Sequence, residues 1–138
     1  MKTLLSVVLL LLLFSVNASA ESFGPHFAPF TIAPVDGWTQ QAIDSGVSIT
    51  KGKNRLTIQI LKAGNLTAKQ FAKALVDEAK LQKADFDCDS DGCMVVAEDN
   101  GVPVTLIINA VDDFVHILTL RGDDKATMHT MIESITFQ

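Results

Sequence analysis

The sequence lacks the short motifs that mark several common enzyme classes. It has no Gly-x-Ser-x-Gly nucleophile turn, no glycine-rich phosphate loop and no His-Glu-x-x-His zinc motif. Its three histidines are scattered along the chain, at positions 26, 116 and 129. We therefore expect that the protein is not an enzyme, and no residue is assigned a catalytic role.

Basic side chains are also scarce. The chain has 11 Lys and Arg against 16 Asp and Glu, which gives a formal net charge of −5. Nucleic acids and anionic lipids would repel such a surface, so neither is expected as a partner. Leu, Ile, Val and Phe recur throughout, and the length suits one domain with a real core.

Residues 1–20 have the pattern of an export signal. Lys2 precedes an apolar run from Leu4 to Val16, and Ala18-Ser19-Ala20 supplies small residues for cleavage. The run is shorter than the ~20 residues that a membrane helix needs, so we expect no membrane span after cleavage. The expected location is the periplasm, with secretion as the alternative. The Asn65-Leu66-Thr67 sequon matters only if the source glycosylates its exported proteins.

Two cysteines in an exported chain favour one disulfide. Cys88 and Cys93 flank Asp89-Ser90-Asp91-Gly92, a sequence with ordinary turn chemistry, so they would face each other across the base of a hairpin loop. Closing so small a ring is expected to stabilise the fold by roughly 2 kcal/mol in the chain-entropy model. The Cys-x-x-Cys spacing of redox proteins is absent.

The same stretch also fits the EF-hand calcium-loop pattern. Asp87, Asp89 and Asp91 fill the first three ligand positions and Glu98 the last, with Gly92 at the sharp turn. However, residues 93–97 favour a strand, which would carry Glu98 ~20 Å from Gly92. We therefore favour the disulfide-bonded turn and predict no cofactor. Calcium remains the alternative, including a weak, open site formed by the three aspartates alone.

The remaining patterns predict a mainly antiparallel sheet with two helices. Hydrophobic alternation and turn signals predict strands at residues 30–32, 39–44, 47–51, 55–61, around 86, 93–99, 102–111 and 114–121. Thr67 with Gln70 forms a capping-box sequence for one helix, and Asp123 or Asp124 caps a second. The last two strands are apolar on both faces and need cover on both. We therefore predict an α+β fold, an α/β/α sandwich of about six to seven strands with a helix on each face.

The opening Phe30-Thr31-Ile32, Pro34 and Gly37-Trp38 is followed by a meander, a helix, a second meander and a helix ending in Ile-Glu-Ser-Ile. This order resembles the PsbP-like superfamily, which includes the photosystem II extrinsic subunit, a Ran-binding nuclear import factor and DcrB-type periplasmic proteins. The resemblance implies a single PsbP-like domain over residues 30–138, preceded by an extended lead-in at residues 21–29.

The resemblance also implies a binding or accessory role without catalysis, and it supplies no shared set of functional residues. We expect the partner to be another envelope or secreted protein, bound through a surface that the sequence does not locate. Trp38, Met128 and Met131 are expected in the core, and His116 is expected to be a sheet residue rather than a ligand. The sequence predicts no oligomeric state.

Overall fold

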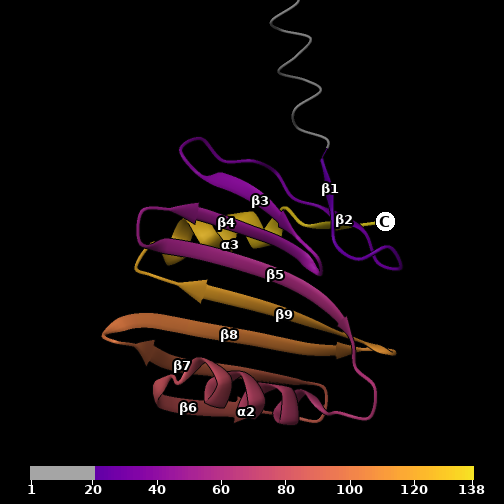
Figure 1. Cartoon of the computed structure of the whole chain (residues 1–138), viewed down its shortest axis with the longest axis vertical. Helices are drawn as coiled ribbons and strands as arrows, with labels where there is room; N and C mark the ends of the chain where they lie inside the picture. Colours follow the sequence, from indigo (N-terminus) through magenta and orange to yellow (C-terminus); the bar gives the residue numbers. More distant parts are fainter. Residues whose placement is uncertain (1–20) are drawn as a thin grey trace, which may run out of the picture.

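The structure is a computed structural model that describes residues 21–138, so the expected signal peptide at residues 1–20 lies outside the described residues. It is built on one seven-stranded antiparallel sheet, in the order β3-β4-β5-β9-β8-β7-β6 (Figure 1). The strands are β3 (Thr39–Ile43), β4 (Gly46–Lys51), β5 (Asn54–Lys62), β6 (Gln82–Cys88), β7 (Gly92–Asp99), β8 (Val102–Val111) and β9 (Phe114–Arg121). The two predicted meanders are confirmed.

Local turn chemistry sets the register of these strands. Asn100 and Gly101 both have positive φ, as a two-residue hairpin turn requires, and they join β7 to β8. At the first hairpin, a Cβ on Gly46 would collide with the backbone carbonyl oxygen of Ile58 on the neighbouring strand. Glycine at position 46 therefore allows β4 and β5 to pair closely.

A second, three-stranded sheet was not predicted. It consists of β1 (Ser22–Phe23), β2 (Phe30–Thr31) and β10 (Thr136–Phe137), with β2 in the middle. The strand predicted at residues 30–32 corresponds to β2. Strands β1 and β10 are too short to produce a hydrophobic period, which explains why the sequence did not indicate them. The side chain of Phe23 is only 4% exposed, so the expected lead-in contributes to the folded core.

The first helix, α2 (Ala68–Ala79), begins as its sequence predicts. The Thr67 hydroxyl accepts a hydrogen bond from the backbone N–H of Gln70, and the Gln70 side chain accepts one from the backbone N–H of Thr67. The helix ends at Lys80, which adopts a left-handed conformation. The buried face of α2 presents Ala68, Ala72 and Val76.

The second helix, α3 (Lys125–Glu133), is shorter. Its N-cap is Asp124, whose side chain accepts a hydrogen bond from the backbone N–H of Thr127. Met128 and Met131 are its buried residues, which confirms their predicted place in the core.

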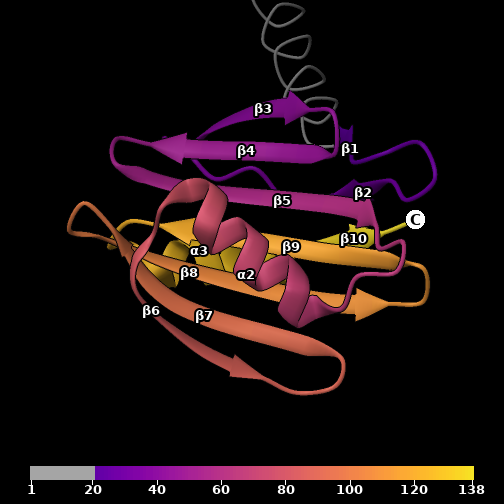
Figure 2. The same ribbon diagram turned by 60° about the horizontal axis from the view of Figure 1, so that its bottom comes forward.

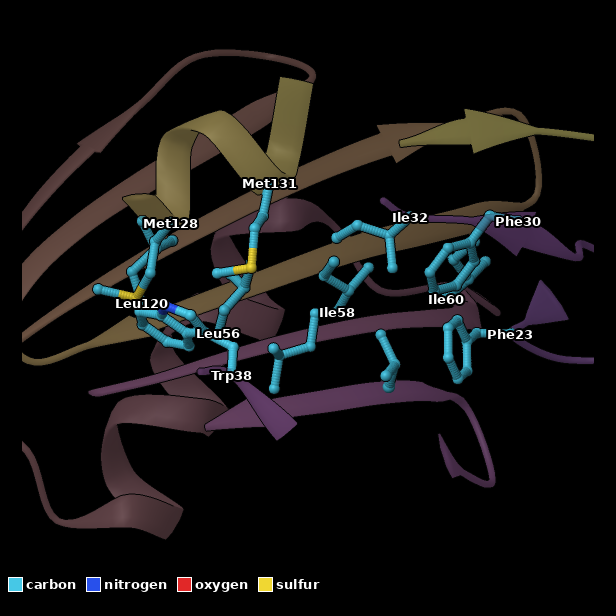
Figure 3. Close-up of a cluster of buried hydrophobic side chains, with 12 residues drawn as sticks. Phe23, Phe30, Ile32, Trp38, Leu56, Ile58, Ile60, Leu120, Met128 and Met131 are labelled. Carbon is cyan, nitrogen blue, oxygen red and sulfur yellow. The ribbon is translucent and has the colours of Figure 1, made fainter. Parts of the chain in front are cut away.

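Strand alternation divides the core into two clusters. One cluster joins α2 to the sheet through buried residues of β7, β8 and β9, among them Val95, Ile108 and Ile117. The other joins α3 to the small sheet and the main sheet, and contains the following buried residues: Phe23, Phe30, Ile32, Trp38, Val47, Ile49, Leu56, Ile58, Ile60, Leu120, Met128 and Met131 (Figure 3). Trp38 is therefore a core residue, as predicted.

The two helices lie over different parts of the sheet (Figure 2). Their clusters contain alternate side chains of β9, with Leu120 in one and Ile117 in the other. Helix α2 contacts β6, β7 and β8. Helix α3 packs on side chains of β4, β5 and β9. The structure thus supports two parts of the predicted fold class, the mainly antiparallel sheet of seven strands and the two helices. The small sheet is an addition to that prediction.

Candidate functional site

The β6–β7 hairpin carries the residues that the sequence singled out. Cys88 and Cys93 are paired in the register of the two strands and form a disulfide, with their Cα atoms 4.1 Å apart. The backbone N–H of Asp89 donates to the carbonyl oxygen of Gly92, and Ala110 N–H on β8 donates to the Asp91 carbonyl oxygen at 2.8 Å. The loop is thereby held at its base by the disulfide and at its tip by β8.

Asp89 stabilises this turn with its own carboxylate. One carboxylate oxygen of Asp89 accepts hydrogen bonds from the backbone N–H of Asp91 at 2.9 Å and of Gly92 at 2.8 Å. These two bonds, the one from Asp91 first, hold the pKa of the Asp89 carboxyl below its usual value. This carboxylate is therefore occupied in maintaining the loop conformation.

The four acidic residues of the calcium pattern do not converge. Asp87 and Asp89 line a shallow hollow of about 240 Å³, whereas the Asp91 side chain is not among its walls. Glu98 lies near the opposite end of β7, where it forms an exposed ion pair with Lys83 at 3.6 Å. Among residues 21–138, no three His, Cys, Asp or Glu side chains are grouped closely enough to hold a metal ion.

Beside the hairpin lies a part of the main sheet that neither helix covers. We call it the open face: it consists of side chains of β6, β7 and β8 on the side of the sheet where α3 packs, namely Asp85, Asp87, Met94, Val96, Thr105 and Ile107. Met94 is 46% exposed and Val96 49% exposed, while Thr105 and Ile107 are half-buried. An apolar centre on two strands is thus bordered by two carboxylates on the edge strand.

The register shows why these residues are uncovered. One row of cross-strand neighbours runs from Asp87 through Met94 and Ile107 to Leu118 and Ile58. The inner end of this row lies in the cluster under α3, and the outer end is in solvent. Seven strands span ~29 Å, whereas a helix with its side chains is ~10 Å in diameter, so α3, which runs roughly along the strands in Figure 1, covers only part of this surface.

The open face continues into a second hollow beneath the C-terminal end of α3. This hollow of about 190 Å³ is lined by the following residues: Ile58, Ile60, Asn109, His116, Leu118, Ile132, Ile135 and Phe137. Asn109 lines both this hollow and the one at the hairpin. We call the two hollows, which share Asn109, together with the open face the sheet groove.

His116 is the titratable side chain of this second hollow. Its ring centroid lies 5.0 Å from that of Phe137, which is 53% exposed in β10. Partial burial lowers the pKa of His116, because desolvation disfavours the charged imidazolium. The hollow is therefore neutral and largely apolar near pH 7, apart from the Asn109 amide and the imidazole.

One further sequence pattern needs a structural check, because Ser48-Ile49-Thr50-Lys51 has the Ser-x-x-Lys spacing of some acyl-transfer enzymes. These residues lie in β4. In a strand, side chains three positions apart point to opposite faces of the sheet, so the Ser48 hydroxyl and the Lys51 amine are directed apart. This arrangement does not provide an activated nucleophile.

Sequence reasoning did not locate the open face, although one signal was present. Both faces of β8 and β9 are apolar, which predicts cover from a helix on each side. The sequence offers one helix for each side, and the diameter of a helix, ~10 Å, is much smaller than the ~29 Å width of seven strands. Part of the sheet is therefore expected to stay uncovered.

Comparison with known proteins supports the fold. The chain is similar to the solution structure of the cyanobacterial PsbP (CyanoP) from Synechocystis sp. PCC 6803, with a TM-score of 0.50 and 12% sequence identity over 86% of this chain and 92% of that chain. No protein-family model and no curated protein sequence matches. The PsbP-like fold expected from the sequence is therefore confirmed, and identity this low transfers the fold alone.

Two observations bear on location. The disulfide indicates an oxidising compartment. Within the described residues, neither helix is long and apolar enough to cross a bilayer.

Proposed function

We propose that this chain, which has the PsbP-like fold, is a non-catalytic accessory protein that binds another exported protein through its open face. The single observation that carries the proposal is the exposure of Met94 and Val96 on β7, a strand that is paired on both sides and contacts α2 on its other face. Exposed neighbouring apolar residues rimmed by polar ones are typical of a protein-binding surface. Across the described residues, the buried core contains no polar or charged side chain.

We also propose where the protein acts and that its mature chain forms one domain. The disulfide and the signal-like residues 1–20 support export to the periplasm, where the mature chain would act as a single domain. The α2 and α3 clusters, which use alternate side chains of β9, support the description of this domain as an α/β/α sandwich.

The proposal is tested by affinity capture from the exported fraction of the source cells with three forms of the protein. Met94→Thr/Val96→Thr removes the two exposed apolar side chains of the open face and places β-branched residues, which suit a strand, at both positions of β7. Val111→Thr is the matched control, because Val111 is 45% exposed on β8 but lies four residues beyond Ile107, ~13 Å along the strand. A partner retained by the wild type and the control but lost by the double variant supports the proposal. Equal retention by all three forms contradicts it.

A further inference from the structure

The sheet groove has the width of one helix. Its floor consists of β6, β7 and β8, which together span ~10 Å, and a helix with side chains has a diameter of ~10 Å. On the opposite side of the sheet, the same three strands are in contact with α2. These strands therefore have a helix on one side and solvent on the other.

The groove has two different flanks. On the inner flank, Ile132, Ile135 and Phe137 at the end of α3 and in β10 present apolar surface. On the outer flank, Asp85 and Asp87 are exposed along the edge strand β6. The loop carboxylates of Asp89 and Asp91 extend this acidic flank beyond the end of the strand.

The basic side chain next to this flank on β6 is Lys83, two residues before Asp85, and its amine forms an exposed ion pair with the Glu98 carboxylate at 3.6 Å. The net charge of −5 adds a long-range attraction for cations. An occupant that buries Met94, Val96 and Ile107 must therefore bring positive charge close to Asp85 and Asp87, because these carboxylates would otherwise be partly desolvated without a partner.

We propose that the sheet groove binds one amphipathic helix of a partner protein, with its apolar face on Met94, Val96 and Ile107 and with lysine or arginine side chains along the β6 flank. Such a helix would lie beside α3 on the same side of the sheet. Its apolar positions would follow the i, i+3, i+4, i+7 pattern of helix-in-groove recognition. This inference rests on the proposed function and specifies the chemistry of the partner.

The test uses synthetic probes with the purified protein. One probe is a fluorescent helical peptide of about fifteen residues with a leucine stripe and lysines elsewhere; the second has glutamates in place of the lysines, and the third alternates valine and lysine to favour a strand. We expect the leucine–lysine helix to bind and the leucine–glutamate helix not to bind in fluorescence anisotropy. Hydrogen exchange should show protection of β7 and β8 rather than of the β6 edge.

Matched variants separate a specific site from general attraction between opposite charges. Asp85→Asn/Asp87→Asn should weaken binding of the leucine–lysine helix about fivefold at low salt, and less at high salt. Asp77→Asn/Glu78→Gln removes the same number of charges from exposed positions on α2 and should leave the affinity nearly unchanged. Met94→Thr/Val96→Thr should weaken binding about tenfold, whereas Val111→Thr should not.

Several results would overturn the inference. Equal losses in the two charge variants would mean non-specific attraction, and tighter binding of the valine–lysine peptide would mean pairing at a sheet edge. A dimer in sedimentation that Met94→Thr/Val96→Thr dissociates would identify a second copy as the occupant. If partner capture depends on the open face but the leucine–lysine helix does not bind, the inference fails and the proposed function stands.

Discussion

Asp87 lies directly opposite Met94 in the register of β6 and β7, so a carboxylate at the edge of the sheet is the cross-strand neighbour of a half-exposed apolar side chain. Both residues therefore belong to the β6–β7 hairpin and to the open face. Asp87, Asp89 and Asp91, which fit the first three ligand positions of a calcium loop, lie with Asp85 along the border of an apolar surface. Their proposed role is to select the charge of a protein partner.

The disulfide is expected to stabilise the hairpin without carrying the activity. Cys88→Ala/Cys93→Ala should lower the free energy of unfolding by about 2 kcal/mol, because it releases a small ring in the unfolded chain. Alanine avoids placing a hydroxyl at position 93, which is buried against α2. Urea unfolding of the variant and of the wild type, each with and without reductant, measures the effect. A reductant that destabilises the variant as much as the wild type would contradict this explanation.

Glycine at position 46 is expected to be required for strand pairing. Gly46→Ala should destabilise the protein by more than ~2 kcal/mol, because the new Cβ collides with the Ile58 carbonyl oxygen on β5. Gly64→Ala is the control: Gly64 has a positive φ of 59° but no atom within 4 Å of an added Cβ, so only backbone strain of ~1 kcal/mol is expected. Thermal unfolding of both variants distinguishes them, and a smaller cost at position 46 would be inconsistent with the predicted collision.

His116 is expected to make stability depend on pH. Burial lowers its pKa in the folded state, so below the usual pKa of about 6.5 the unfolded chain binds more protons than the folded chain. This contribution to stability is fully present above pH 6.5 and decreases as the pH falls from there toward the folded-state pKa. His116→Asn should reduce the slope of unfolding free energy against pH in this window, relative to the wild type. An unchanged slope would rule out His116 as its source.

Calcium is expected to have no effect on stability. Glu98 forms an ion pair with Lys83, and one Asp89 oxygen accepts two backbone hydrogen bonds. These side chains are therefore not arranged to bind one calcium ion together. We expect the same melting temperature in millimolar calcium and in chelator. An increase with calcium that Asp87→Asn abolishes would instead support the weak, open site.

The open face is expected to contribute little to folding. Met94→Thr/Val96→Thr should change the free energy of unfolding by only about 0.5 kcal/mol per site, because both side chains are half-exposed. Circular dichroism and urea unfolding provide the check. A large loss of stability would mean that Met94 and Val96 are needed for folding. Weaker partner binding by the variant would then reflect unfolding and not the loss of a contact surface.

Local signals made most of the main sheet and both helices predictable. Thr67 with Gln70 marked the start of α2, and Asn100-Gly101 marked the β7–β8 turn, because capping and turn formation depend on neighbouring residues. The opposed cysteines followed from the four-residue loop between them. These features depend on contacts that are near in sequence.

Long-range features were not predictable in the same way. The small sheet pairs Thr31 with both Ser22 and Thr136, so strands from the two ends of the described chain meet over a two-residue length that leaves no period. The open face depends on where α3 ends relative to the sheet width, which is a tertiary property. Asp87 and Met94 were each visible in the sequence, but only the register shows that they share one surface.

The most direct test of the account is site-specific photo-cross-linking in the exported compartment of the source cells. A photoreactive amino acid is placed at position 96 in the open face, and in a second form at the exposed position 77 on α2. We expect a discrete adduct with another exported protein from position 96, which Asp85→Asn/Asp87→Asn weakens, and none from position 77. The absence of an adduct at position 96, or the same adduct from both positions, would contradict it.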